Sequence, residues 1–274
     1  MSSIHIALPG AAGRMGQMIA SLISESPQFD LTLVSENPDA GKVGADYGSL
    51  TGLKFEGLTL AASLAGLSQS ETGEKKADVV IDFTAPAATM QHLAAARAAG
   101  TAMVIGTTGL SEADEAMLTD ASKDIPIVYC ANTSVGVTLL ANLVREVARQ
   151  LDESWDIEIV ETHHNRKVDA PSGTALALGK AAAEGRSVDL DAVRDSGRDG
   201  ITGARQSGDI GFAVMRGGDV AGEHSVLFFG EEERIELTHK ATSRRIFGRG
   251  ALKAAQFAAS AKPGLYSMDD VLKA

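Results

Sequence analysis

The first half of the chain alternates short hydrophobic strands with amphipathic helices. Apolar residues repeat with period two over residues 4–8, and this pattern stops at Pro9-Gly10. They then recur at helical spacing over residues 15–23, which predicts a helix with one apolar face. Further strands are expected at residues 31–34, 79–81, 102–105 and 125–129, and a further helix at 87–99. Strands that alternate with helices predict a parallel sheet with right-handed crossovers.

The pattern changes in the second half, after a helix expected over residues 140–151. Residues 155–159 alternate strictly between apolar and polar, so this strand should have one solvated face. Comparable strands are expected at residues 210–214, 226–229 and 235–238. Such a run of strands predicts a mostly antiparallel sheet in a second domain. A final amphipathic helix is expected over residues 247–258.

Length and composition fit this two-domain picture. At about 150 residues per domain, a chain of 274 residues predicts two domains. The formal net charge of −11 disfavours nucleic acid and anionic membranes as partners. A single cysteine excludes an intrachain disulfide. No apolar run is long enough to span a membrane and the first residues lack a basic region, so we expect a cytoplasmic protein without a signal peptide. The polar segment 68–76 is expected to be a surface loop.

A glycine-rich turn, GAAGRMG at residues 10–16, joins the first strand to the first helix. Glycines at these positions allow a tight turn, close approach of a pyrophosphate and close packing of the helix on its strand. The helix N-terminus adds N–H groups and partial positive charge for phosphate. Glu36 ends the second strand 20 residues after Gly16, where an acidic side chain can accept hydrogen bonds from ribose hydroxyls. The alternative is an ordinary glycine turn before a helix.

Two further loops should lie at the carboxyl ends of parallel strands, where open α/β sheets bind ligands. One is GTTG at residues 106–109, and the other is CANTS at residues 130–134. Their small and hydroxyl-bearing side chains allow close approach of nicotinamide and ribose. Ordinary turn chemistry is the competing interpretation of both loops.

The segment ETHHNRKVDAPSGT, residues 161–174, carries the richest chemistry. Two histidines, an arginine and a lysine cluster in an otherwise acidic chain, which favours an anionic substrate or a proton-transfer site. Ser172 can cap the helix that follows, so the N–H groups of Gly173 and Thr174 form a potential carboxylate site. The alternative is a solvated turn before a capped helix. A zinc site is disfavoured, because adjacent histidines usually point apart and no third ligand is evident.

Together these segments resemble one enzyme family. The motifs are GAAGRMG, IDFT at residues 81–84, GTTG, ANTSVGV at 131–137, HHNRKVDAPSGTA at 163–175, and GEHS with THKATSR within 222–244. In this order, and over nearly the whole chain, they resemble 4-hydroxy-tetrahydrodipicolinate reductase, also called dihydrodipicolinate reductase. The resemblance implies an α/β fold with two domains: a Rossmann-type parallel sheet over 1–131 and 241–274, and an α+β domain with an open mixed sheet over 132–240.

The resemblance also implies a reaction and the residues that perform it. NADH or NADPH would reduce a cyclic dicarboxylate imine in the diaminopimelate route to lysine. His163 matches the family's acid/base residue and Lys167 its proton donor. His164 matches a substrate-binding residue, and Gly173 with Thr174 the carboxylate clamp. The residues that match cofactor contacts are Gly10, Ala11, Ala12, Gly13, Arg14, Met15, Glu36, Asn37, Gly106, Thr107, Thr108, Cys130, Ala131, Asn132 and Thr133. The second domain would assemble a homotetramer through its sheet.

Two residues depart from the common family pattern. Asn37 stands where many members carry a basic residue that would bind the 2′-phosphate of NADPH. We therefore expect NADH to be used at least as well as NADPH, although Lys42 is an alternative cation. Thr133 stands where an aromatic residue is frequent, which predicts looser packing around the nicotinamide.

The sequence leaves several other interpretations open. The four histidines outside the cluster are expected to be structural: His5, His92, His224 and His239. Cys130 is expected to be a small buried residue. If it were a nucleophile, the chain would instead be a semialdehyde-type dehydrogenase. A non-catalytic nucleotide-sensing protein on the same fold is a third possibility.

Overall fold

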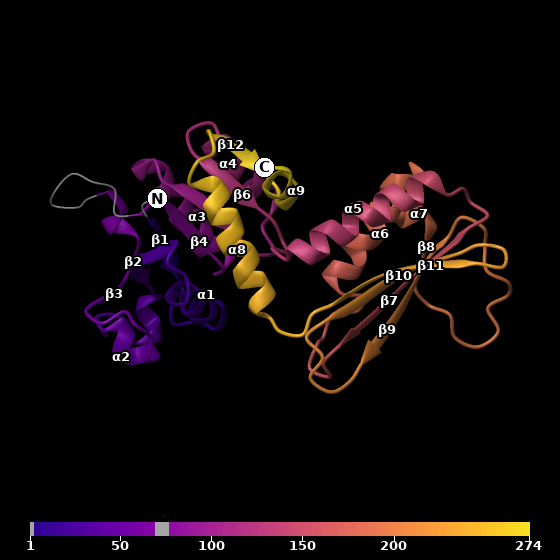
Figure 1. Cartoon of the computed structure of the whole chain (residues 1–274), viewed down its shortest axis with the longest axis horizontal. Coiled ribbons are helices and arrows are strands. Elements are labelled where there is room, and N and C mark those ends of the chain that lie inside the picture. The colour runs from indigo at the N-terminus through magenta and orange to yellow at the C-terminus, as the bar shows by residue number, and fades with distance from the viewer. Residues whose placement is uncertain (1–2, 69–76) are drawn as a thin grey trace. The chain divides into compact units, whose positions relative to one another are not determined.

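The computed structural model describes residues 3–68 and 77–274 (Figure 1). The chain divides into two compact units. The first unit comprises residues 1–134 and 245–274, and the second unit comprises residues 135–244. Of the loop predicted at residues 68–76, residues 69–76 lie outside the described part of the chain. No helix within the described ranges is long and apolar enough to cross a membrane.

The described residues of the first unit form a seven-stranded sheet in the order β12-β6-β5-β4-β1-β2-β3. Every strand pairing in this sheet is parallel, as the strand–helix alternation predicts. The strands are β1 (Ile4–Pro9), β2 (Phe29–Ser35), β3 (Leu60–Ala61), β4 (Val79–Asp82), β5 (Ala102–Ile105), β6 (Pro126–Tyr129) and β12 (Gly264–Tyr266). The central strands are buried on every residue because helices cover both faces. This order places the sheet's topological switch point between β1 and β4.

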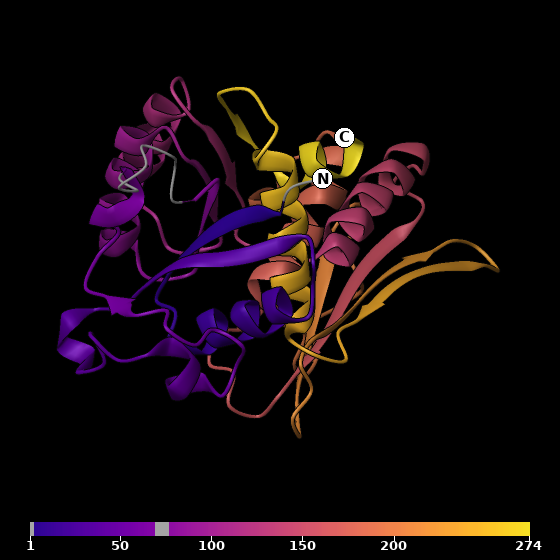
Figure 2. The same cartoon turned by 60° about the vertical axis from the view of Figure 1, so that its left-hand side comes forward.

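Helices cover both faces of this sheet. They are α1 (Arg14–Ser24), α2 (Tyr47–Thr51), α3 (Pro86–Ala99), α4 (Glu112–Ala121), α8 (Arg245–Ala258) and α9 (Met268–Lys273), with 3-10 turns η1 (Pro38–Ala40) and η2 (Ala65–Ser68). Leu93 of α3 and Leu118 of α4 belong to one core with Val80, Met103 and Ile127 of the sheet. Helix α8 instead contacts α1 and strands β4, β5 and β6 (Figure 2). The unit is therefore a three-layer α/β/α sandwich.

Helix α8 packs closely against the loop that follows β6. Thr133 donates a hydrogen bond from Oγ1 to the carbonyl of Phe247, 2.7 Å away. A Cβ at Gly250 would lie 1.7 Å from the Thr133 carbonyl oxygen, so only glycine allows this approach. The predicted helix at 247–258 is confirmed as α8. It is not the last element, however, because β12 and α9 follow it.

The second unit is a five-stranded sheet, among the described residues, in the order β11-β10-β7-β9-β8. Its strands are β7 (Asp156–His163), β8 (Arg194–Asp195), β9 (Ile210–Arg216), β10 (Glu223–Phe229) and β11 (Arg234–Lys240). Strand β10 pairs antiparallel with β7 and β11, whereas β9 pairs parallel with β7 and β8. The sheet is therefore mixed, which confirms what the resemblance implies, and the strand pattern alone did not reveal its parallel pairings. Helices between β7 and β8 form a crossover that returns the chain in the same direction.

Three helices lie on one face of this second sheet, namely α5 (Val135–Gln150), α6 (Gly173–Arg186) and α7 (Leu190–Val193). Ile157, Ile159, Val226 and Phe228 point to this face and are fully buried. Strand β7 consequently alternates between buried and half-buried residues along its whole length. The alternation predicted at residues 155–159 is thus confirmed, and it continues to His163.

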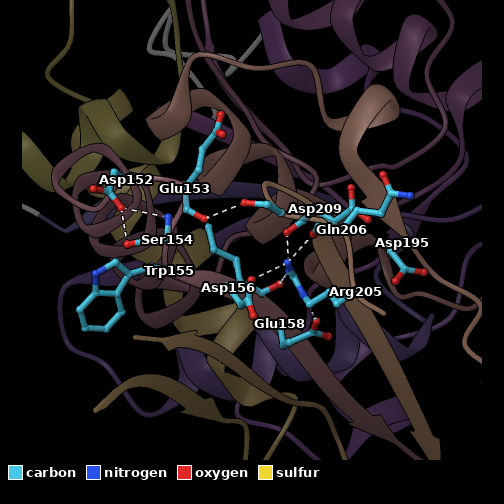
Figure 3. A network of polar contacts seen from close by, with 12 residues as sticks. Asp152, Glu153, Ser154, Trp155, Asp156, Glu158, Asp195, Arg205, Gln206 and Asp209 are labelled. Atoms are coloured by element: carbon cyan, nitrogen blue, oxygen red, sulfur yellow. Dashed lines mark hydrogen bonds and ion pairs between the residues drawn. The ribbon is translucent and has the colours of Figure 1, made fainter. Parts of the chain in front are cut away.

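Arg205 ties the long segment before β9 to the start of β7 (Figure 3). Its guanidinium donates to Asp156 at 2.7 Å, to Glu158 at 3.0 Å and to the carbonyl of Ile157 at 3.1 Å. It also donates to the carbonyl of Asp209. These contacts involve the β7 face opposite to the one that α5 and α6 cover, since side chains alternate between faces along a strand.

Candidate active site

The glycine-rich turn after β1 has the backbone that a dinucleotide site requires. Gly10 has a φ of +63°, and a Cβ at Gly16 would lie 2.3 Å from the Gly10 carbonyl oxygen. No side chain caps the N-terminus of α1 at Gly13. The first-turn N–H groups of a helix have no intrahelical acceptor, and here they suit a phosphate. The residues present therefore fit the pyrophosphate of a nicotinamide cofactor.

Glu36 lies at this turn, as the sequence spacing predicts. One carboxylate oxygen accepts a hydrogen bond from the backbone N–H of Ala12 at 3.1 Å, and the other accepts from Asn37 N–H at 3.0 Å. Asn37 in turn accepts from the N–H of Asp39 and caps the 3-10 turn η1. Glu36 is half-buried beside the glycine turn, and each of its carboxylate oxygens can accept a further hydrogen bond.

A buried polar network organises the sheet edge around the GTTG loop. Asp82 ends β4 and is fully buried. It accepts hydrogen bonds from Thr84 Oγ1 at 2.6 Å and Thr107 Oγ1 at 3.2 Å, and its other oxygen lies 2.7 Å from His92 Nδ1. These bonds fix the first residues of the loop that begins at Gly106. A Cβ at Gly106 would overlap the ring of Phe83, so this position also needs glycine.

The third predicted loop follows β6. Cys130 donates its backbone N–H to the carbonyl of Ile105 at 3.1 Å, which extends the sheet pairing by one residue. Cys130 is half-buried and not fully buried as expected, but the partial loss of solvent still raises the pKa of its thiol to about 12, which disfavours the thiolate that a nucleophile needs. Asn132 Oδ1 accepts from the N–H of Ser134 and closes the turn. Thr133 is buried and bonded to α8, so its side chain supports the loop from within the unit.

In the second unit, the end of β7 carries a buried carboxylate–imidazole pair. Glu161 is 1% exposed and His163 is 8% exposed. The Nδ1 atom of His163 lies 2.5 Å from Glu161 Oε2. Arg216 of β9 donates to both oxygens of Glu161 at 2.8 Å, and the backbone N–H of Ser172 donates at 2.9 Å. Burial alone would raise the pKa of Glu161, but hydrogen bonds from Arg216 and His163 lower it, so the carboxylate stays ionised.

His224 of β10 completes this cluster. Its ring meets the ring of His163 edge to face, with centroids 5.1 Å apart, and its Nε2 lies 3.0 Å from Ser172 Oγ. The expectation that His224 lies outside the cluster is therefore wrong. Pairing of β10 with β7 brings it there, with His224 opposite Glu161. Burial lowers the pKa of His224 to about 4, and the nearby His163 acts in the same direction.

The turn after β7 adds cationic side chains. Lys167 Nζ lies 2.8 Å from Asp169 Oδ1, and the hydrogen bond from Lys167 lowers the pKa of Asp169. His164 accepts a hydrogen bond at Nε2 from Arg244, 3.0 Å away. Partial burial, together with the positive charges of Arg244 and Arg166, lowers the pKa of His164. The neutral imidazole is thus favoured at this position.

The N-terminus of α6 lies next to these groups in the chain. Ser172 caps the helix and accepts from the N–H of Ala175 at 3.1 Å, as predicted. Gly173 and Thr174 form the first helical residues, and the side of Gly173 where a Cβ would stand is open. Backbone N–H groups in such a first turn favour an anion. The arrangement can therefore hold a carboxylate beside an imidazole and an ammonium.

The structure thus collects the predicted residues into two sets. The glycine turn, Glu36 and the loops at 106–109 and 130–134 all belong to the carboxyl edge of the first unit's sheet. His163, His164 and Lys167 belong to the second unit and follow one strand. Sequence reasoning missed three partners that other segments supply, namely Arg216, His224 and Arg244.

Known protein families match both units. Residues 4–133 match the family described as dihydrodipicolinate reductase, N-terminus, and residues 136–272 match dihydrodipicolinate reductase, C-terminus. The chain belongs to the dihydrodipicolinate reductase family. Two proteins from Rhodopseudomonas palustris, strains BisA53 and BisB5, are 52% and 53% identical to it over 272 residues. Both are named 4-hydroxy-tetrahydrodipicolinate reductase, and each match covers 99% of this chain and at least 97% of the relative.

Solved structures show the same fold. A dipicolinate-bound dihydrodipicolinate reductase from Paenisporosarcina sp. TG-14 superposes with a TM-score of 0.77 at 24% identity, covering 98% of this chain and 99% of that one. An amine dehydrogenase from Mycobacterium smegmatis gives a TM-score of 0.62 at 14% identity, covering 98% of this chain and 96% of that one. The Rossmann-type sheet with a second mixed sheet is therefore the fold of this reductase family.

The low pKa of His224 predicts a pH-dependent stability of this family member. Since the folded-state value of about 4 lies below the ordinary 6.5, the neutral ring stabilises the fold above pH 6.5. That contribution is lost as the pH falls from 6.5 to 4, and it amounts to about 3 kcal/mol in total. His224→Gln should therefore show a flatter decline of unfolding free energy over this window. Urea unfolding at fixed protein concentration, at several pH values, measures it; parallel declines would contradict the assignment.

Proposed function

We propose that this chain reduces 4-hydroxy-tetrahydrodipicolinate to tetrahydrodipicolinate with NADH or NADPH, in the diaminopimelate route to lysine. The observation that carries the proposal is the buried Glu161–His163 pair beside Lys167 and the α6 N-terminus. The family assignment supplies the reaction, and this site supplies groups suited to it. We also propose that the enzyme acts in the cytoplasm, consistent with its one free cysteine.

A cyclic dicarboxylate needs two anion sites, and the second unit offers the residues for them. The N–H groups of Gly173 and Thr174 would bind one carboxylate at the helix N-terminus. Lys167 would leave its ion pair with Asp169 and bind a negatively charged group of the substrate. The Asp169 side chain is more than half exposed, so water can solvate its carboxylate after Lys167 has left. His164, held by Arg244, would donate a hydrogen bond from its other nitrogen.

The reduction also needs a proton. When bound, a reduced nicotinamide would supply a hydride to the ring that forms after the 4-hydroxyl group leaves as water, and negative charge would develop on the atoms conjugated to the reduced carbon. His163 would deliver the proton, because an imidazole changes charge near neutral pH. The Lys167 ammonium would stabilise the developing charge and serve as a proton donor. The negative charge of the ionised Glu161 would balance the positive charge of a protonated His163 in this buried position.

The cofactor would be held by the first unit. Its contacts would be the turn at residues 10–15, Glu36 with Asn37, the loop at 106–108 and the loop at 130–133. These segments all lie at the carboxyl edge of the parallel sheet, where open α/β sheets bind ligands.

NADH is expected to serve at least as well as NADPH. Asn37 has no charge, its side-chain oxygen is bonded to Asp39 N–H, and the adjacent Asp39 would repel a 2′-phosphate. One missing charge-assisted contact is worth about 1.5–3 kcal/mol, or roughly one to two orders of magnitude in preference. Comparing kcat/KM for both cofactors tests this, and Asn37→Arg should move the ratio toward NADPH. A strong NADPH preference in the unaltered enzyme would show that another cation, such as exposed Lys42, binds the phosphate.

A coupled assay tests the proposed activity directly. The substrate is generated by the preceding synthase, and loss of reduced nicotinamide absorbance reports turnover. Cofactor binding without turnover would instead indicate a nucleotide-sensing protein. Cys130→Ser should retain activity, because burial raises the pKa of this thiol to about 12. Loss of turnover in a folded Cys130→Ser enzyme would favour covalent semialdehyde chemistry.

We further propose that the second unit assembles a homotetramer through the open face of its sheet. Val160, Leu227 and Phe229 lie half-buried on this face, and Met215 is 53% exposed there. An apolar surface of this kind is typical of an interface. Light scattering should give four times the 28.4 kDa chain mass. Met215→Asp should lower that mass, whereas a monomeric unaltered protein would contradict the proposal.

A further inference from the structure

We propose that Glu161 and Arg216 form a positioning pair that fixes the tautomer and sets the proton affinity of the His163 ring. The inference rests on the proposed role of His163 as proton donor and extends it to two residues without an assigned role. Neither residue needs to touch substrate or cofactor, because both act through the imidazole.

Glu161 is held more firmly than a surface carboxylate. Both oxygens accept from the Arg216 guanidinium at 2.8 Å, one also accepts from Ser172 N–H, and the other lies 2.5 Å from His163 Nδ1. The side chain is on the buried face of β7, in line with Ile157 and Ile159. A carboxylate buried this deeply is retained only when its hydrogen bonds are satisfied, as they are here.

This contact decides which nitrogen of His163 exchanges protons. An ionised carboxylate can only accept, so Nδ1 carries a hydrogen in both the neutral and the charged ring. Nε2 is then the atom that gains and loses the proton. A Cβ at residue 222 would lie 2.9 Å from Nε2, so glycine at this position leaves space beside that atom.

Charges around the ring come from four segments. Glu161 lies on β7, Arg216 on β9, His224 on β10, and His164 and Lys167 on the turn after β7. The negative charge of Glu161 favours the imidazolium. Arg216 disfavours it, because its positive charge repels the imidazolium and also partly neutralises the Glu161 carboxylate. Removing one member of the pair should therefore change the proton affinity of His163 in the opposite direction from removing the other. A purely structural role predicts no such opposite signs.

The test is an NMR titration of ¹³C-labelled histidine rings in the full-length protein, with the His163 signal identified by its absence in His163→Asn. In Glu161→Gln, the His163 ring should lose its proton at a lower pH than in the unaltered protein. In Arg216→Gln, it should lose the proton at a higher pH than in the unaltered protein. In steady-state assays, Glu161→Gln should lower kcat by about 10- to 100-fold and shift its pH profile, with KM changed less than about threefold.

Glu158 provides a matched control on the same strand. It also pairs with arginines on the opposite face of the sheet, with Arg198 at 2.7 Å and with Arg205 at 3.0 Å (Figure 3). Glu158→Gln removes a comparable ion pair and should leave both the titration of His163 and the pH profile unchanged. If Glu158→Gln changed the His163 titration and the pH profile as much as Glu161→Gln does, the effect would come from the loss of any ion pair on this strand and not from the contact with His163.

An unchanged His163 titration in Glu161→Gln, or shifts of the same sign in both variants, would overturn the proposal. If Glu161→Gln does not fold, Arg216→Gln decides the question alone. The proposal is contradicted if the His163 ring of Arg216→Gln loses its proton at the same pH as in the unaltered protein, or at a lower one. The titration needs neither substrate nor cofactor. Should His163→Asn keep full turnover, the proton-donor role would fail while the positioning claim would still be decided by NMR.

Discussion

His163→Ala and Lys167→Ala are each expected to lower kcat by about 10²–10⁴-fold while NADH and NADPH still bind. In the proposed mechanism, His163 supplies the proton that completes the reduction, and Glu161, 2.5 Å from its Nδ1, keeps the ring oriented. In the same proposal, Lys167 supplies the positive charge that binds the dicarboxylate and stabilises the charge that develops on it. Both residues belong to the second unit, whereas the predicted cofactor contacts belong to the first, so cofactor affinity should be spared.

Steady-state kinetics with saturating cofactor measure the loss, and fluorescence titration of reduced cofactor checks binding. Lys180→Ala is the matched control for the lysine, because Lys180 is exposed on α6. It should retain the turnover of the unaltered enzyme. Turnover close to the unaltered level in either active-site variant would remove that residue from the mechanism.

Gly250→Ala is expected to lower the unfolding free energy by about 1–3 kcal/mol or more. The added methyl group would lie 1.7 Å from the carbonyl oxygen of Thr133, which is backbone and cannot rotate away. Alanine normally favours a helix interior over glycine by about 1 kcal/mol, so the clash must exceed this gain for the sign to hold. Helix α8 or the loop at 130–133 would have to move, which should also weaken cofactor binding.

Thermal unfolding at fixed protein concentration measures this effect, at roughly 2–4 °C for each kcal/mol in a protein of this size. Gly197→Ala is a suitable control, because a Cβ there meets no atom within 4 Å. A Gly250→Ala protein with unaltered melting temperature and cofactor affinity would show that α8 does not brace the loop.

Hydrophobic periodicity predicted most of the regular structure, because burial on one or both faces imposes it. The strand at 102–105 and the helices at 15–23 and 247–258 lie within a residue or two of their observed bounds. Strand β12 and helix α9 were missed because each is too short to show a period. The parallel pairing of β9 was missed because alternation along a strand does not encode the direction of its neighbours.

The candidate site was predictable where its residues are adjacent in sequence and not where sheet register brings them together. The HHNRK segment is visible in the sequence itself as a cluster of histidine and cationic residues. Arg216 and His224 reach Glu161 only through the pairings of β9 and β10 with β7. One signal was nevertheless present, since Glu161 falls on the apolar face of an alternating strand. A charged residue at such a position requires a partner from another segment.

The second unit is inserted into the sequence of the first unit, and this constrains the order in which the two units can fold during synthesis. Residues 135–244 are continuous, so they can fold as soon as they leave the ribosome. The earlier sheet must wait for α8 to cover β4, β5 and β6 and for β12 to pair with β6. A nascent chain halted before residue 245 would thus expose the apolar surface of β4, β5 and β6 that α8 covers in the complete fold.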